Sequence, residues 1–202
     1  MIIDYTPQGT PEWMALRLGK PSASRASEIY TMTGVVSKSR IPYMEELAWE
    51  AITGTNEETY KSKDMQAGND KEGDSRAEFE WSHDVVLTQV GCVFYDDAKL
   101  FLASPDGLIL PWEEGFETKN AKRSVQSKVL HDRKPDPDHW CQMQMGMLCT
   151  GYKAWWYQRY CFQLPTLTLK IPRDEKYISA LHHELDVFCV QLEQTVERFR
   201  NL

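Results

Sequence analysis

Helical and strand-like segments follow one another in groups along this chain of 202 residues, and their order restricts the fold. A short helix capped by Ser22 or Ser24 and a long final helix with an apolar stripe from Tyr177 to Phe199 are expected. The other predicted elements are helices at 11–17, 42–53, 66–81 and 137–149, and strands at 85–87, 92–95, 100–103, 153–162 and 167–171. This order predicts a single α/β domain over residues 1–202, with a central mixed β-sheet flanked by helices and a long C-terminal helix.

Composition places the chain among ordinary globular domains. Its residues are 42% hydrophobic and 26% charged, which is enough apolar material for one sizeable core. The first twenty residues lack the apolar segment of a signal peptide, and no apolar run approaches the roughly 20 residues that span a bilayer, so a cytoplasmic protein without membrane contact is expected. The five cysteines include no CxxC pair, which favours reduced thiols over disulfides or a zinc site.

Two acidic residues and a lysine follow the strand predicted at 100–103. Asp106 lies in the turn Ser104-Pro105-Asp106-Gly107, and the triplet Glu117-Thr118-Lys119 comes shortly after it. Because alternate residues of a strand share a face, Glu117 and Lys119 should project together, with Asp106 beside them and the Thr118 carbonyl available as a hard oxygen ligand. Carboxylates that hold Mg²⁺ and a lysine that orients or deprotonates water suit phosphodiester hydrolysis. A Glu-x-Lys triplet is expected about once by chance in such a chain, so this interpretation depends on the accompanying turn.

Basic residues gather between positions 119 and 134, although the net charge of the chain is −7. The segment includes Lys122, Arg123 and Lys128, and its one acidic residue is Asp132. Contacts from these side chains to DNA phosphates would supply affinity and little sequence information. The alternative is an ordinary solvated helix face, which is what most charge runs are.

Together these motifs resemble the lambda exonuclease or YqaJ-type family of phage recombinases, within the restriction-endonuclease-like PD-(D/E)xK nucleases. The resemblance covers most of the chain and implies a restriction-endonuclease-like core. Each piece is short, and it is their order that is specific. The pieces are Trp13 to Gly19, Ser22 to Ser24, Tyr43 to Gly54, Gly68 to Glu72, Ser104 to Leu108, Glu117 to Lys119 and Gln142 to Met145.

The resemblance also implies roles for individual residues. Glu72, Asp106, Glu117 and the Thr118 carbonyl correspond to metal ligands for Mg²⁺, with Mn²⁺ as a substitute. Lys119 and Gln144 correspond to residues that position or activate water. Gln142 and Gln144 are two positions apart on a helix and cannot share a face, so only one of them should reach the site, and the family pattern favours Gln144.

Arg17 and Ser24 match the family's pocket for a 5′-terminal phosphate. A guanidinium fork and a hydroxyl at a helix start suit a dianionic phosphate. The alternatives are an ion pair for Arg17 and an N-cap for Ser24. Either Lys38 or Arg40 would complete the pocket, and the sequence does not choose between them. Met65 sits where the family places an apolar wedge that parts terminal base pairs, and its alternative is a core methionine.

The implied activity is that of a Mg²⁺-dependent 5′-to-3′ exonuclease on double-stranded DNA ends. It would release mononucleotides and leave 3′ overhangs for phage-type recombination by strand annealing. A ring-shaped homotrimer, a single-strand annealing protein as partner and a phage or prophage origin in a bacterial host belong to the same expectation.

Two other functions stay open at this point. One is a restriction-like or repair endonuclease of the same fold, which would cut closed circular DNA. The other is a non-catalytic DNA-end-binding module, in which the acidic residues are structural. Histidine-based zinc chemistry is not expected, because His182 and His183 are adjacent on a helix and His131 and His139 read as surface or loop residues.

Overall fold

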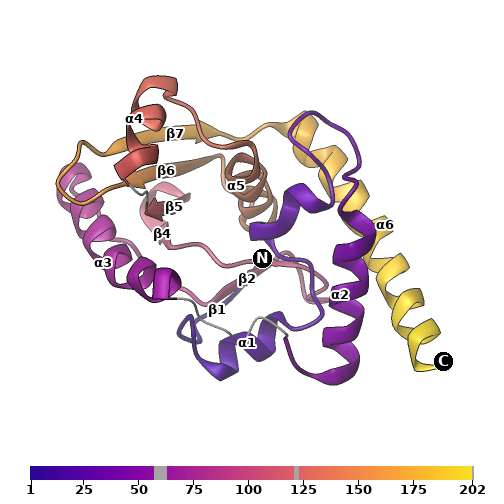
Figure 1. The fold of residues 1–202 in the computed structure, drawn as a ribbon. Helices are drawn as coiled ribbons and strands as arrows, with labels where there is room; N and C mark the ends of the chain where they lie inside the picture. The colour runs from indigo at the N-terminus through magenta and orange to yellow at the C-terminus, as the bar shows by residue number, and fades with distance from the viewer. Residues whose placement is uncertain (57–62, 121–122, 202) are drawn as a thin grey trace.

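The computed structural model describes the backbone of residues 1–56, 63–120 and 123–201, and the side chains of these residues apart from 63–71 (Figure 1). The predicted helices are confirmed with small shifts of their ends. The N-terminal elements are β1 (Ile2–Asp4), α1 (Pro11–Arg17), the 3-10 helix η1 (Ala23–Glu28), α2 (Arg40–Thr53) and α3 (Lys63–His83).

A four-stranded mixed sheet forms the centre of the domain, as predicted. Its strand order is β4 (Gly107–Ile109), β5 (Glu114–Asn120), β6 (Ala154–Tyr160) and β7 (Leu167–Pro172). The short 3-10 helix η2 (Leu110–Trp112) joins β4 to β5. Strands β5 and β6 are parallel, whereas the two outer pairs are antiparallel. The connection from β5 to β6 runs through α4 (Arg123–Asp132) and α5 (Pro137–Thr150), the kind of crossover that parallel neighbours require.

The remaining strands form a separate three-stranded antiparallel sheet in the order β1-β2-β3, with β2 at Cys92–Phe94 and β3 at Leu102–Ala103. The prediction of a strand at 85–87 is wrong. Asp84 takes a positive φ of 53° at the end of α3, and the chain then makes an isolated bridge between Thr88 and Leu108. Leu87 is apolar because it packs in a buried cluster with Phe79, not because it joins a sheet.

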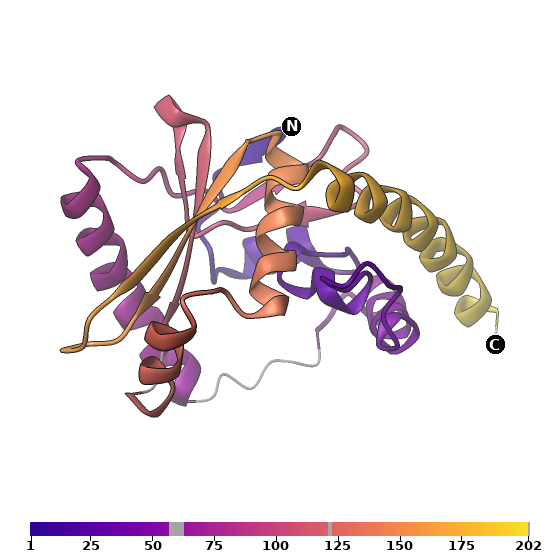
Figure 2. The ribbon, with the colours of Figure 1, turned by 90° about the horizontal axis from the view of Figure 1, so that it is seen from above.

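Helices cover the two faces of the four-stranded sheet, with α3 on one face and α5 on the other (Figure 2). The period of two along β5 decides which residue meets which helix. Phe116 lies against Phe79 of α3, whereas Glu117 lies against Gln142 of α5. This arrangement leaves α5 between the four-stranded sheet and the elements η1, β2 and β3, all of which it contacts.

The contact between α5 and the sheet is close because two glycines face one tryptophan. Trp155 of β6 is buried between Gly115 of β5 and Gly146 of α5. A Cβ atom on Gly115 would lie 2.3 Å from the Trp155 ring, and one on Gly146 would lie 2.7 Å from it. The absence of side chains at both positions therefore fixes how near α5 lies to the sheet.

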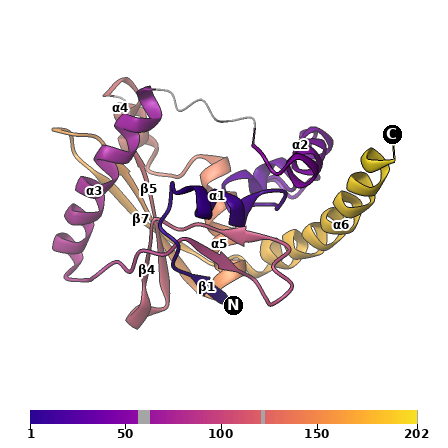
Figure 3. The ribbon, with the colours of Figure 1, turned by 90° about the horizontal axis from the view of Figure 1, so that it is seen from below.

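The long C-terminal helix α6 (Glu175–Arg200) packs along α2 and also contacts α5 (Figure 3). Its predicted apolar stripe is confirmed: Leu181, Leu185 and Phe188 are fully buried, and Phe199 at the far end stacks on Trp49 of α2. None of the helices, over the residues that the structure describes, is long and apolar enough to cross a membrane.

Candidate active site

Glu117 and Lys119 project from the same face of β5, as their spacing predicts. The Lys119 Nζ atom lies 2.7 Å from Glu117 Oε1, and Glu117 is only 3% exposed. Thr118 points to the opposite face, where its hydroxyl and that of Ser75 on α3 form a hydrogen bond. The strand therefore presents a carboxylate and an ammonium group together on the α5 side of the sheet.

Asp106 joins this pair from the turn between β3 and β4. The antiparallel pairing of β4 with β5 places Gly107 opposite Phe116, so that the preceding residue lies beside the triplet. Asp106 Oδ2 accepts a hydrogen bond of 2.7 Å from the backbone N–H of Thr118. The two carboxylates and the lysine predicted from the sequence are thus brought together.

The charge of Lys119 does not fully offset the burial and mutual repulsion of the two carboxylates, so the pKa values of both are raised. Burial and the charge of Glu117 raise the pKa of Asp106 well above its usual range, and Lys119 only partly opposes this. Burial also raises the pKa of Glu117. Burial alone would lower the pKa of Lys119, but Glu117 and Asp106 raise it above its ordinary value. A cation between the carboxylates would relieve their repulsion.

Glu72 contributes to the same field from α3. Its charge raises the pKa of both Asp106 and Glu117, while its side chain pairs with Arg76 one turn along the helix. Over the described side chains, those of residues 1–56, 72–120 and 123–201, no group of three or more His, Cys, Asp or Glu is gathered closely enough to hold a metal ion. The buried Glu117 and the half-buried Asp106 nevertheless fit Mg²⁺, which proteins commonly bind through one or two carboxylates plus waters and substrate phosphates.

The helix residue that reaches the carboxylates is Gln142. Its Nε2 donates a hydrogen bond of 2.7 Å to Glu117 Oε1. Gln144 lies on another side of α5, where it donates to the carbonyl of Pro172 and accepts from the N–H of Asp174 at the start of α6. In the structure, Gln142 is the glutamine beside Glu117, whereas the family pattern favours Gln144, which bonds to residues elsewhere.

Arg17 lies beside the acidic turn. Its Nη1 donates a hydrogen bond of 2.8 Å to Ser104 Oγ, two residues before Asp106, and its guanidinium lies 4.6 Å from the centroid of the Trp13 ring. Burial lowers the pKa of Arg17. Within the described part of the chain, no carboxylate lies within ion-pair distance of this guanidinium, so the alternative of a surface ion pair is not found.

Ser24 lies in η1, which contacts β3. It is exposed, and its Oγ lies 3.1 Å from Ser22 Oγ, while Ser22 pairs with Leu102 of β3. The N-cap of η1 is Ser22, whose side chain makes no capping hydrogen bond. The capping role expected for one of these serines is therefore absent, and the exposed Ser24 hydroxyl is available to a ligand.

Lys38 and Arg40, the two candidates for completing the phosphate pocket, have different surroundings in the structure. Arg40 is buried and donates hydrogen bonds to Glu184 of α6, with its guanidinium 5.3 Å from the Phe188 ring centroid. It therefore joins α2 to α6 and cannot serve a ligand, whereas Lys38 is exposed before α2. Met65 falls in α3, but its side chain lies outside the described residues.

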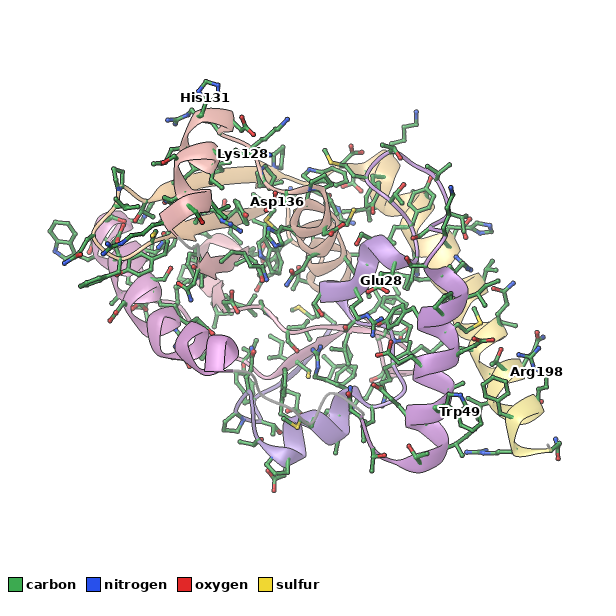
Figure 4. The ribbon with its side chains drawn as sticks, viewed as in Figure 1. Glu28, Trp49, Lys128, His131, Asp136 and Arg198 are labelled. Carbon is green, nitrogen blue, oxygen red and sulfur yellow. The ribbon has the colours of Figure 1, made fainter. Side chains whose placement is uncertain are left out.

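Helix α4 carries the basic segment. Arg123 and Lys128 are exposed, while Gln126 and Val129 form the buried side of the helix. Figure 4 shows Lys128 and His131 on α4, with Asp136 beside the start of α5. Lys122 lies outside the described residues. These basic side chains thus face solvent. Their exposure is consistent both with an ordinary solvated helix face and with a surface that binds DNA.

A polar cluster that the sequence analysis missed lies next to Lys119. Strand pairing places Tyr157 opposite Glu117 and Arg159 opposite Lys119. His139 of α5 lies with its Nδ1 2.9 Å from the Tyr157 hydroxyl and 3.3 Å from Asp136 Oδ2. The parallel register of β5 and β6 brings this cluster together, and the residue pattern within each strand does not reveal that register.

The cavities differ in their relation to these residues. A space of about 10 Å³, near the size of one water molecule, is bounded by Ser104, Glu117 and Gln142 among others. A cavity of about 380 Å³ lies elsewhere, between η1, the loop before α2 and the start of α5, and none of the predicted site residues lines it. Charge and hydrogen bonding, rather than cavity size, therefore identify the candidate site.

Comparison with known proteins identifies the family of the chain and structures that resemble it. Residues 12–153 match the model of a family described as the YqaJ-like viral recombinase domain. Two crystal structures of the alkaline exonuclease LHK-Exo from Laribacter hongkongensis, one of them in complex with dAMP, are similar to the chain. Their sequence identities are 31% and 32%, and each has a TM-score of 0.85 over 95% of this chain and 97% of that chain.

A phage-related exonuclease from Haemophilus somnus 129PT shares the fold, with 14% identity and a TM-score of 0.68 over 89% of this chain and 96% of that chain. No curated protein sequence matches the chain.

Proposed function

Because the chain belongs to the YqaJ-like viral recombinase family, we propose that it is a metal-dependent exodeoxyribonuclease that degrades double-stranded DNA from its 5′ ends. It releases mononucleotides and leaves 3′ single strands for recombination by annealing. The observation that carries the proposal is the carboxylate pair of Asp106 and Glu117 with Lys119 on one face of the sheet, in a chain 31% identical to an exonuclease. The dAMP bound to LHK-Exo supports a mononucleotide product.

Asp106, Glu117 and the Thr118 carbonyl would hold Mg²⁺, and Glu72 would add negative charge from α3. When bound, the ion supplies Lewis-acid stabilisation of the phosphoryl oxygens and a more acidic water. The Asp106 hydrogen bond to the Thr118 N–H keeps the turn against the strand, so that both carboxylates face the same place.

Lys119 acts as a cation in this proposal. Burial opposes its charged form, but Glu117 and Asp106 raise its pKa in the metal-free protein, and an ammonium group here would orient the attacking water and the phosphate. Gln142 positions Glu117 through its hydrogen bond and takes the role first assigned to Gln144. No other described helix side chain donates a hydrogen bond to this carboxylate.

Arg17 and Ser24 would bind the terminal 5′ phosphate and so set the polarity of degradation. The guanidinium has no described carboxylate partner, and an anion would repay the free energy that its burial costs. Because Ser104 links Arg17 to the turn that carries Asp106, the anchored end lies beside the carboxylates.

The exposed Arg123 and Lys128 on α4 would contact the DNA backbone, together with Lys122. Met65 would act as the wedge that parts the terminal base pair, and Lys38 is the cation left to assist the phosphate pocket. The family resemblance extends the proposal to a ring-shaped homotrimer and to a single-strand annealing protein from the same phage or prophage.

Digestion of three DNA substrates tests this function. Linear duplexes with and without 5′ phosphates and a covalently closed circle are incubated with Mg²⁺, Mn²⁺ or EDTA, using the wild type and Lys119→Ala. Metal-dependent loss of linear DNA alone, faster from phosphorylated ends and abolished by the substitution, is expected. Cutting of the circle would indicate an endonuclease, and binding without cleavage would indicate an end-binding module.

A further inference from the structure

A buried arginine lies one strand away from Lys119 on the same face of the sheet. Arg159 of β6 is opposite Lys119 of β5 in the parallel register, so the two side chains leave the sheet side by side. The Arg159 side chain is 9% exposed, compared with 28% for Lys119. The face that carries the carboxylates therefore holds a second cation that the mechanism above does not use.

The partners of Arg159 are few for a buried guanidinium. Its Nη1 lies 3.5 Å from the Tyr157 hydroxyl and 3.6 Å from Asp136 Oδ2. Its buried Nε has no hydrogen-bond partner within the part of the chain that the structure describes. A buried charge with such weak pairing costs free energy unless a further anion binds it.

Arg40 shows what a buried arginine with a structural role has in the same molecule. Its guanidinium lies 2.9 Å from Glu184 Oε2, donates to the Glu184 carbonyl at 3.2 Å and lies 3.4 Å from Gln191 Oε1. These bonds use both Nη atoms of Arg40, whereas Arg159 has one distant carboxylate and one hydroxyl, both near Nη1. The difference indicates that the partner set of Arg159 is incomplete in the protein alone.

Asp136 is suited to be a temporary partner. Its side chain is 59% exposed, and although it is the N-cap residue of α5, it makes no capping hydrogen bond through its side chain. It can therefore swing into solvent at little cost. His139 adds no positive charge here, because burial and the nearby Lys119 lower its pKa to about 4.

We propose that Arg159 is a further DNA-binding residue, whose guanidinium binds a backbone phosphate of the degraded strand close to the phosphate that Lys119 contacts. Asp136 fills part of that place in the DNA-free protein and is displaced by the phosphate. Tyr157 holds the guanidinium in line with the sheet. The proposal rests on the proposed nuclease function and adds a phosphate contact and a competing carboxylate to it.

Substitutions of the two partners should act in opposite directions. Steady-state kinetics are measured on a 5′-phosphorylated linear duplex at several salt concentrations, with Arg159→Gln, Arg159→Lys and Asp136→Asn. Arg159→Gln should raise KM about tenfold with little change in kcat, and it should reduce the salt slope of KM by about one, as the loss of one phosphate contact predicts. Asp136→Asn should lower KM, and Arg159→Lys should fall between wild type and Arg159→Gln.

Arg40→Gln is the matched control, since it removes an equally buried arginine away from the site and should lower Tm without changing KM. A rise in KM for Asp136→Asn, or an unchanged KM for a folded Arg159→Gln, would overturn the proposal. If Arg159→Gln does not fold, Asp136→Asn decides alone, because its side chain is exposed.

If the wild type cuts no DNA, the proposed function fails separately. Fluorescence-anisotropy titration of the same duplex then replaces kinetics, and equal affinities of wild type, Asp136→Asn and Arg159→Gln would overturn the Arg159 assignment.

Discussion

The two faces of β5 divide its residues between stability and chemistry. Toward α3, Phe116 packs on Phe79 with ring centroids 4.5 Å apart. Toward α5, the buried Glu117 forms an ion pair with Lys119 beside Asp106, and the pKa values of both carboxyl groups are raised. One face therefore gains free energy from apolar contact, while the other holds charges at a cost that a ligand would offset.

The polar groups of the two faces differ in the same way. On the α3 face, Gln158 donates to the Ser75 carbonyl at 2.8 Å and accepts from Thr168, so its amide is fully used. On the α5 face, Arg159 retains a buried Nε without a partner in the described part of the chain. The comparison teaches that incomplete pairing, more than polarity, marks the functional side of this sheet.

The largest effect expected is on catalysis. Lys119→Ala should lower kcat by about 10³-fold, because it removes the cation that offsets charge at the reacting phosphate. It should also lower Tm, because Glu117 is left buried without its cation. Single-turnover digestion of the folded protein and thermal unfolding measure the two quantities. Lys170→Ala is the matched control, since Lys170 pairs with Glu114 at the other side of the sheet and is half exposed. An unchanged kcat for folded Lys119→Ala would break the division between the faces.

Phe79→Ala tests the opposite face. The side chain is fully buried against Phe116 and Trp156, so its truncation should cost about 3–5 kcal/mol of unfolding free energy while the folded fraction keeps its kcat. Urea denaturation measures the cost. Trp81→Ala on the same helix, with 87% exposure, should change stability by no more than about 0.5 kcal/mol. Loss of kcat in folded Phe79→Ala would show that the faces are not separable.

His139 makes the stability of the α5 face depend on pH. Its pKa is lowered to about 4, chiefly by burial and then by Lys119 and Arg159, against Asp136 and Asp138. A histidine whose folded pKa lies below its unfolded value contributes stability above pH 6.5 that is lost as the pH falls through 6.5 to 4, here about 2–3 kcal/mol. Unfolding of wild type and His139→Gln at pH 7 and pH 4.5 should give a difference that shrinks at the lower pH. Parallel pH profiles would contradict this.

The smallest effect distinguishes the two glutamines. Gln142→Met should lower kcat about tenfold, because Glu117 loses a hydrogen bond that orients it. Gln144→Met should leave kcat unchanged and lower Tm, since it removes the bonds to Pro172 and Asp174 that attach α5 to the start of α6. The reverse pattern of rates would restore the choice made from the family motif.

Local patterns were sufficient for most elements and for the core of the site. The period of two in Glu117-Thr118-Lys119 places the carboxylate and the ammonium group together, and the turn at Asp106 supplies the second carboxylate. Both features depend only on residues close in sequence, so they could be predicted. The amphipathic stripe of α6 is likewise a local signal. These predictions needed no knowledge of which elements pack together.

The errors arose where packing between distant segments decides the outcome. The rotation of α5 against the sheet, which selects Gln142, depends on Gly146 meeting Trp155. The cluster of Tyr157, Arg159 and His139 depends on the register of two strands joined by 33 intervening residues, from 121 to 153. The apolar run at 85–87 signalled burial, and periodicity alone does not tell a buried loop from a strand.

The contact of Trp155 with Gly115 and Gly146 also limits how this sequence can change. A single substitution at either glycine would place a Cβ inside the indole ring system, and a smaller residue at Trp155 would leave a void between α5 and the sheet. None of the three positions can therefore change alone without a steric clash or a void. Only simultaneous substitutions would keep the present distance between α5 and the sheet. The position of Gln142, one helical turn before Gly146, therefore depends on these three residues as well.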